Sequence, residues 1–238
     1  MIVVGGGEGS SSSQAACMLC SYDDSGKKIA DWEEIKDKGY IRTMALSSDA
    51  KTLVTGGEDM LVRVWKVDEA KQSIYPLKGH TGVIHSVSIS QCGTFVASAS
   101  ADCDVLLWSL KTEKKDGRME HEAEVNAVCF HGATSDEIIS CAGNLVLVWH
   151  RKSCTIKERL EGHKGPVQCL ALHPRPHCSN LVFSGSMDRT IRVWGVDENL
   201  AWKAVDENLA WTGHSAGIKA LVCAPVGNLM ASGSCDKK

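Results

Sequence analysis

The sequence of 238 residues has no long hydrophobic run and no excess of basic side chains. None of its apolar stretches approaches the roughly 20 residues that a membrane-spanning helix needs. The opening Met1–Gly7 lacks the basic start and long apolar core of a secretory signal. The formal net charge of −3 argues against a dedicated nucleic-acid-binding protein, whose surface carries a basic patch.

The eleven cysteines are not arranged as a disulfide framework, because their number is odd and most of them lie in alternating apolar segments. Without an export signal, this pattern favours reduced thiols that act as small core residues. We therefore expect a protein of the cytoplasm or the nucleus.

Phenylalanine and tyrosine are scarce, with three of each, whereas there are seven tryptophans. Four of the tryptophans each end a short β-rich run, and they recur as Trp65, Trp108, Trp149 and Trp194. Their intervals are 43, 41 and 45 residues, and Tyr22 lies 43 residues before the first of them. A fixed period of this length predicts a repeat architecture.

Histidines form a second series in step with the tryptophans. They are His80, His121, His163 and His214, with intervals of 41, 42 and 51 residues, and all but His121 follow a glycine. After each histidine come an alternating strand, a polar turn, a second strand, a tight turn and then, in the first three units, the tryptophan strand. Short strands at regular spacing predict an all-β repeat.

This period of about 42 residues, with these markers, resembles the WD-repeat family, in which each unit is a four-stranded blade of a β-propeller. The resemblance covers nearly the whole chain and implies an all-β propeller of four-stranded antiparallel blades, of which about five to six are visible. We expect one WD-repeat propeller domain over residues 1–238, with a partial blade at 1–36, blades at 37–78, 79–119, 120–161 and 162–212, and a partial blade at 213–238. Both partial blades supply a second strand, so we expect the propeller to be incomplete, as in a fragment of a longer protein.

The family pattern is not followed everywhere. No tryptophan is followed by aspartate, so the dipeptide that gives the family its name is absent. The unit that ends at Trp65 has Thr55 and Asp59 but no histidine, and the unit that ends at Trp149 has Asn144 at the aspartate position. We expect these departures to change local hydrogen bonds and to leave the fold intact.

The resemblance implies that histidine, serine, aspartate and tryptophan of one blade form a buried chain of hydrogen bonds. Such a chain satisfies every polar atom and makes the blade rigid. Two units contain all four residues, and the expected structural network is His80, Ser98, Asp102 and Trp108, with His163, Ser184, Asp188 and Trp194.

The same residue types could be read as a nucleophilic Ser-His-Asp triad. An enzyme needs one such site, whereas this set repeats at a fixed period, and no G-x-S-x-G motif exposes a serine. We expect no catalytic residue, no enzyme activity and no cofactor.

Other motifs have simpler structural explanations. Gly5–Gly9 lacks the Lys-Ser/Thr of a P-loop and predicts a turn after the strand Ile2–Val4. Cys17 and Cys20 have the spacing of half a zinc site, but residues i and i+3 of a strand point to opposite faces. His173, His177 and Cys178 stand in a proline-containing turn. We therefore expect no metal site.

Two short segments are a tandem copy of each other: Val196–Trp202 recurs as Val205–Trp211. The copy explains why the last histidine interval is 51 residues, and it places Trp202 and Trp211 outside the tryptophan series.

The strands of a blade alternate in direction, so the loop that holds the histidine and the turn that ends at the aspartate lie on one face. Residues three and five places after the histidine, and the residue before the aspartate, should form a rim there. The resemblance implies that this rim is the docking surface. Its expected members are Tyr40, Arg42, Glu58, Val83, His85, Glu124, Asn126, Gln168, Met187 and Lys219, with Ala101 and Pro166 beside them.

We therefore expect a non-catalytic scaffold or adaptor that nucleates a multiprotein complex through the faces of the propeller. Its partners should be other proteins, and not a membrane. The alternative is a nucleic-acid-binding propeller in an RNA-processing or chromatin complex, which the near-neutral charge disfavours.

Overall fold

The computed structural model describes residues 2–7, 17–22, 28–31, 40–67, 71–72, 76–132, 134–173, 181–197, 201–205, 211–224 and 229–236. Over these ranges the chain consists of strands, turns and connecting segments, with no helix, which confirms the all-β expectation. Accordingly, no helix in them is long and apolar enough to cross a membrane.

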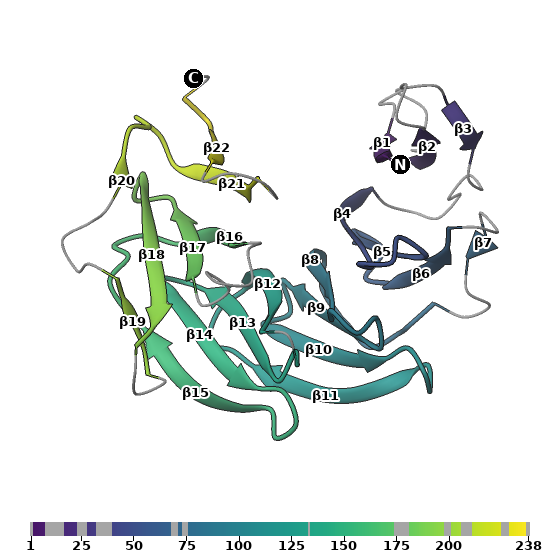
Figure 1. Ribbon diagram of the computed structural model, residues 1–238, viewed down its shortest axis with the longest axis horizontal. Coiled ribbons are helices and arrows are strands. Elements are labelled where there is room, and N and C mark those ends of the chain that lie inside the picture. Colours follow the sequence, from purple (N-terminus) through teal and green to yellow (C-terminus); the bar gives the residue numbers. More distant parts are fainter. Residues whose placement is uncertain are drawn as a thin grey trace. The chain divides into compact units, whose positions relative to one another are not determined.

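The strands form antiparallel sheets in which neighbours in sequence are neighbours in space (Figure 1). The first sheet has three strands, β1 (Ile2–Gly7), β2 (Cys17–Tyr22) and β3 (Lys28–Asp31). The next sheet has four, β4 (Ile41–Leu46), β5 (Thr52–Gly57), β6 (Arg63–Lys66) and β7 (Lys71–Gln72). The third sheet also has four, β8 (Ile84–Ile89), β9 (Phe95–Ser100), β10 (Asp104–Ser109) and β11 (Lys114–Glu120).

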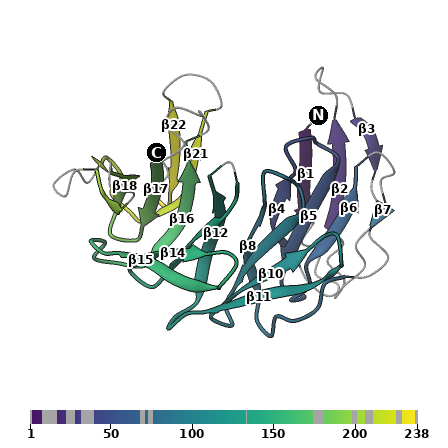
Figure 2. The same ribbon diagram turned by 60° about the horizontal axis from the view of Figure 1, so that its bottom comes forward.

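The remaining strands repeat the pattern (Figure 2). One sheet consists of β12 (Val125–His131), β13 (Glu137–Ala142), β14 (Leu145–His150) and β15 (Thr155–Leu160). The next consists of β16 (Val167–Leu172), β17 (Leu181–Ser186), β18 (Thr190–Val196), β19 (Trp202–Ala204) and β20 (Trp211–Thr212). The last described sheet has β21 (Ile218–Cys223) and β22 (Met230–Ser234).

The chain forms two compact units, residues 1–102 with 106–116, and residues 103–105 with 117–238. Within the first unit, β4 packs beside β8; within the second, β12 packs beside β16 and β16 beside β21. The first strands of successive sheets therefore pack against one another inside each unit, as the blades of a propeller do.

Burial falls from the middle to the outer edge of a sheet. In the central strand β14 the four residues from Val146 to Trp149 are all buried. In the outer strand β15 only Leu160 is buried. The sequence of β14 is accordingly a continuous apolar run from Leu145 to Trp149, whereas β15 carries charged residues.

Each unit has its own apolar core. In the first, Trp108 packs in a cluster with residues of β5, β8 and β9, including Val54, Ile84 and Val96. In the second, Trp194 packs with residues of β13, β14 and β15.

One local expectation was wrong. The glycines that follow Val4 were predicted to form a turn, but β1 continues to Gly7. Its last three residues pair with Cys17, Met18 and Leu19 of β2, so the ladder with an apolar partner strand extends the strand through the glycines. Residues 8–16 lie outside the described ranges.

The last residues of the two copies of the tandem segment pair with the same strand. Trp202 of β19 pairs with Val196 of β18, and Trp211 of β20 pairs with Ile191 of β18. Trp202 is buried in the cluster around Trp194, whereas Trp211 is 42% exposed.

Candidate functional site

A chain of hydrogen bonds links four residues of the β8–β11 sheet. His80 Nδ1 lies 2.9 Å from Asp102 Oδ2, and His80 Nε2 lies 2.7 Å from Ser98 Oγ. The indole of Trp108 donates to the same oxygen at 2.8 Å. Asp102 also accepts from the backbone N–H of Thr81 at 2.8 Å, so the carboxylate fixes the turn that carries the histidine. A neutral imidazole with its proton on Nδ1 satisfies all these contacts.

The β16–β19 sheet has the same arrangement. His163 meets Asp188 at 2.9 Å and Ser184 at 2.7 Å, and Trp194 donates to Ser184 at 2.8 Å. Burial lowers the pKa of His163, which favours the neutral ring although Asp188 acts in the opposite direction. Burial alone would raise the pKa of Asp188, but hydrogen bonds from Thr190, the Lys164 N–H and His163 together lower it to about 2.

The sheet without a histidine uses an arginine. Trp65 donates to Thr55 Oγ1 at 2.9 Å, as the other tryptophans do to serine. Asp59 forms its ion pair with Arg63, whose side chain is only 4% exposed. Arg63, which was not identified from the sequence, stands two residues before the tryptophan and is buried with it in β6.

The sheet with Asn144 at the aspartate position uses a backbone acceptor. His121 Nδ1 lies 3.0 Å from the carbonyl oxygen of Met119, and Nε2 lies 2.8 Å from Ser140 Oγ. Trp149 donates to Ser140 at 2.8 Å. The indole and hydroxyl part of the chain is thus kept where the carboxylate is lost, and burial lowers the pKa of His121.

A further set of this kind lies in the last sheet, although the expected network did not include it. His214 Nδ1 lies 3.0 Å from Asp236 Oδ2 and its Nε2 lies 2.8 Å from Ser232 Oγ. The signal was present in the sequence, since the spacing of these three residues equals that of His80, Ser98 and Asp102.

The three serines that accept an indole N–H are inaccessible to a substrate. Ser98, Ser140 and Ser184 are all 0% exposed, and each oxygen already accepts an indole N–H. A buried hydroxyl with these partners stabilises the sheet and is not placed to attack a substrate.

The expected rim residues coincide with a recurring irregularity. In the first strand of each sheet from β4 onward, for which the pairing register is known, one residue is skipped in the ladder. Such a β-bulge turns a side chain away from the regular pleat, often next to a binding site. The skipped residues are Arg42, His85, Asn126, Gln168 and Lys219.

In the first unit, the rim residues of neighbouring strands are joined. Glu58 donates its backbone N–H to the carbonyl oxygen of Tyr40, and its carboxylate accepts from Arg42 Nη2 at 2.7 Å. Arg42 is therefore an exposed but paired cation, while Tyr40 is 41% exposed. Val83 accepts from the N–H of Ala101 at 2.9 Å, which holds the corresponding loop and turn together.

In the second unit, the rim residues are linked from one strand to the next. Asn126 Nδ2 donates to the carbonyl oxygen of Val167 at 2.8 Å. Lys219 Nζ donates to Gln168 Oε1 at 2.8 Å. Met187 is 42% exposed and lies against Gly217, where a Cβ would come within 2.5 Å of its sulfur. Glu124 is exposed and lies directly before β12.

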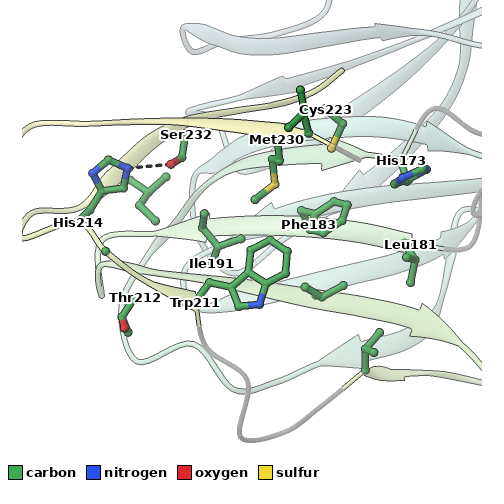
Figure 3. Close-up of a pocket in the computed structure, with 15 residues that line it drawn as sticks. His173, Leu181, Phe183, Ile191, Trp211, Thr212, His214, Cys223, Met230 and Ser232 are labelled. Atoms are coloured by element: carbon green, nitrogen blue, oxygen red, sulfur yellow. Dashed lines mark hydrogen bonds between the residues drawn. The ribbon is translucent and has the colours of Figure 1, made fainter. Parts of the chain in front are cut away.

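An apolar pocket of about 860 Å³ lies along β17, β18, β21 and β22 (Figure 3). Trp211 and Phe183 line it, with their rings 6.0 Å apart, together with Met230. His214 and Ser232 stand at one end, and no tryptophan among the described residues donates to Ser232. The lining of the pocket suits an aromatic or aliphatic group.

The possible metal ligands are not brought together. No group of three or more His, Cys, Asp or Glu side chains within the described ranges is placed to hold a metal ion. Cys17 and Cys20 both lie on β2. His173 lines the apolar pocket, while His177 and Cys178 lie outside the described residues.

Comparison with known families identifies this architecture. The family model for the WD domain, G-beta repeat, matches residues 33–66, 71–109, 154–195 and 207–238, which is more than half of the chain. The chain belongs to the WD-repeat family, and its four-stranded sheets are the blades of a β-propeller. WD repeats in general mediate contacts between proteins and are not catalytic.

Three curated relatives are similar to parts of the chain. Periodic tryptophan protein 2 of Arabidopsis thaliana is 28% identical over 179 residues, which are 71% of this chain and 19% of the relative. Small ribosomal subunit protein RACK1y of Oryza sativa subsp. japonica is 32% identical over 167 residues, 66% of this chain and 48% of the relative. WD repeat- and FYVE domain-containing protein 4 of Homo sapiens is 26% identical over 197 residues, which are 77% of this chain and 6% of the relative. The chain therefore spans less than half the length of these relatives.

One blade lies largely outside the matched segments. Residues 110–153 include β12, β13 and β14, which form a regular ladder and retain the bond from Trp149 to Ser140. This blade has Glu120 in place of the glycine before the histidine and Asn144 in place of the aspartate, so its sequence has diverged further than its backbone.

Proposed function

We propose that this chain is a non-catalytic scaffold that holds other proteins in a complex through the rims of its blades. The observation that carries the proposal is the β-bulge at the same place in successive blades, which presents Arg42 and His85 in the first unit, and Asn126, Gln168 and Lys219 in the second. The residues at these bulges are all polar, and polar residues suit protein recognition at the edge of an interface.

Two exposed side chains strengthen the proposal, one in each unit. Tyr40 and Met187 present apolar groups next to the bulges, and their exposed fractions are 41% and 42%. Tyrosine and methionine are both enriched in the centres of interfaces, where they contribute more binding energy than charged rim residues. We therefore take Tyr40 and Met187 as the anchors of the two rims, with Arg42 beside the first as a charge shared with Glu58.

The test is affinity capture with the whole chain, followed by mass spectrometry. Three variants are compared with the natural sequence: Tyr40→Ala with Arg42→Ala, Met187→Ala alone, and the three changes together. The triple variant should lose the captured partners, and its Tm should stay within about 2–3 °C of the parent because these residues are exposed. The two partial variants show which unit contributes more.

A matched control changes the opposite end of a blade. Lys111, Lys114 and Lys115 belong to the turn and outer strand at the other end of the β8–β11 sheet, and all three are exposed. Replacing them by alanine should leave capture unchanged. If capture survives in the triple rim variant and disappears in the lysine variant, the proposed binding face is wrong.

The second candidate is a propeller that contacts nucleic acid in an RNA-processing or chromatin complex. One relative is named as a small ribosomal subunit protein, which is the observation in its favour. Against it, the chain has 26 basic and 29 acidic residues. Salt-sensitive retention on heparin or RNA would favour this candidate. For either function we propose a location in the cytoplasm or the nucleus.

A further inference from the structure

A second pocket, of about 390 Å³, lies along β15, β18 and β19 in the second unit. It shares no residue with the rim or with the apolar pocket. Its charged side chains are Arg159, Arg192 and Lys203, opposed by Glu161, so cations outnumber carboxylates by three to one. The indole of Trp202 belongs to the lining as well.

Arg192 occupies a position that is apolar in another blade. It stands two residues before Trp194, as Leu106 stands two residues before Trp108. A Cβ on Gly79 would come within 3.2 Å of Leu106 Cδ1, and a Cβ on Gly162 within 2.7 Å of Arg192 Nη1. The guanidinium therefore packs on the glycine just as the leucine methyl does. Leu106 is 2% exposed in an apolar cluster, so the position suits a hydrocarbon and not a charge.

The aspartate that could pair with Arg192, as its counterpart does in the β4–β7 sheet, already has other hydrogen-bond partners. Arg63, at the same position before Trp65, pairs with Asp59. The corresponding carboxylate for Arg192 is Asp188, which instead accepts from His163, Thr190 and the backbone of Lys164. The carboxylate of Asp188 therefore bonds to His163, where the corresponding carboxylate of Asp59 bonds to an arginine.

Two residues that line the pocket each carry a buried donor without an acceptor among the described residues. Arg192 Nε and Trp202 Nε1 are both out of contact with solvent and without a hydrogen-bond partner among the described residues. Leaving such a donor unpaired costs about 1–3 kcal/mol, and more when it is charged, so an acceptor is expected. Arg159 also makes no ion pair in the described part of the chain, while Lys203 meets Asp197 at 3.1 Å.

We propose that this pocket binds a phosphate monoester. Such a group carries roughly −1.5 to −2 charges and three acceptor oxygens, whereas a carboxylate carries one charge and two oxygens in a plane. Lys203 is already paired with Asp197, so the positive charge that attracts the anion comes from Arg159 and Arg192, opposed by Glu161. Two guanidinium groups and an indole N–H supply donors for three oxygens, and guanidinium–phosphate bonds are among the strongest hydrogen bonds that proteins make.

The test is titration of the whole chain with two probes, inorganic phosphate and N-acetyl-O-phosphoserine amide, with acetate at equal ionic strength as the reference anion. Arg192→Leu copies the residue that the β8–β11 blade has at this position, so this variant is expected to fold. It should weaken the binding of both probes by about tenfold or more, since a charged hydrogen bond contributes about 1.5–3 kcal/mol. Lys152→Leu, an exposed cation outside the pocket, should bind as the natural chain does.

A second variant removes only the indole donor. Trp202→Phe keeps an aromatic ring in the buried cluster and lacks the N–H, so it should weaken binding about fivefold or more, the effect of one lost hydrogen bond. In nuclear magnetic resonance spectra, the Nε1–H signal of Trp202 should move as phosphate is added. Tighter binding of the phosphoserine probe than of inorganic phosphate identifies a phosphorylated side chain as the source. Equal binding by the natural chain and Arg192→Leu, with an unmoved Trp202 signal, overturns the proposal.

Discussion

Asn126 donates from Nδ2 to the carbonyl oxygen of Val167 at 2.8 Å, so that its side chain joins the first strand of one blade to the first strand of the next. The same carbonyl also lies 3.7 Å from the sulfur of Cys141. Asn126 was expected to face a partner. The structure gives it a second role that is independent of any partner, as a link between neighbouring blades of the second unit.

Replacing Asn126 by alanine should therefore affect stability before it affects binding. The change leaves the Val167 carbonyl without its amide donor and should lower the free energy of unfolding by about 1 kcal/mol. Urea unfolding followed by fluorescence measures the loss. Gln168→Ala is the matched control, because Gln168 bonds to the exposed Lys219 side chain and not to the backbone. Equal losses of unfolding free energy in the two variants would show that the bond from Asn126 to the Val167 carbonyl does not stabilise the fold.

The buried tryptophans should be the most sensitive positions of the chain. Trp108 and Trp194 are 2% and 1% exposed, and each donates to a buried serine. Truncation to alanine leaves a cavity and removes that donor, so each change should cost about 3–5 kcal/mol of unfolding free energy. Trp211, which is 42% exposed, provides the comparison, and Trp211→Ala should cost about 1 kcal/mol or less. Similar unfolding midpoints in all three variants would contradict the assigned register.

Stability should fall as the solution is made acidic, for two reasons that act in the same direction. The pKa of His163 is lowered by burial, so below about pH 6.5 the unfolded chain takes up a proton that the folded chain does not. The pKa of Asp188 is lowered to about 2, so the unfolded carboxyl is protonated first as the pH falls from about 4. The contribution of Asp188 is fully present near neutral pH and is lost as the pH falls through about 2.

Asp188→Asn separates the two effects. The variant should be less stable than the natural chain at pH 7, and it should lose less further stability between pH 5 and pH 2, because it lacks the carboxyl whose titration is coupled to folding. Thermal unfolding across this pH range tests the expectation. Parallel curves for the two proteins would show that Asp188 titrates alike in the folded and unfolded chains.

The cysteines should differ widely in reactivity. Hydrogen bonds from Ser90 and Thr94 lower the pKa of the exposed Cys92 thiol. Burial raises the pKa of Cys129 to about 12 and that of Cys169 to about 11. Brief treatment with iodoacetamide at neutral pH should modify Cys92 and spare the other two, because the thiolate is the reactive form.

Peptide mass spectrometry measures this selectivity. Thr94→Val removes one of the two hydroxyls and should slow the reaction of Cys92. Denaturant should make all three cysteines react at comparable rates, which shows that the protection comes from the fold. Labelling of Cys129 at the rate of Cys92 in the folded chain would contradict the assigned burial.

The sequence was sufficient for the fold class because the residues that mark it recur at a fixed period. Trp65, Trp108, Trp149 and Trp194 all lie one or two residues before the end of a central strand, and their spacing is set by the length of a blade rather than by local conformation. The all-β expectation and the family were both confirmed. The run Gly5–Gly7 was misjudged because a glycine run resembles a turn until its partner strand is known.

The finer contacts depend on partners that leave no mark in the sequence. The acceptor for Asn126 is a backbone carbonyl 41 residues away, and every residue has such a group. Arg63 and Arg192 occupy equivalent places before a tryptophan, yet within the described part of the chain only the first is paired. Which of them lacks a partner follows from the histidine of the blade, His163, and is seen only when the contacts of Asp188 are known.

The tandem segment shows how such a protein can lengthen. Trp202 and Trp211, the last residues of the two copies, pair with β18 toward the edge of the sheet, while β16 and β17 keep their ladder. An edge strand has a neighbour on only one side, so extra residues there break no second row of hydrogen bonds. The outer edge of this blade is therefore a place where evolution, or an engineer who inserts a reporter sequence, can add chain without rebuilding the interior.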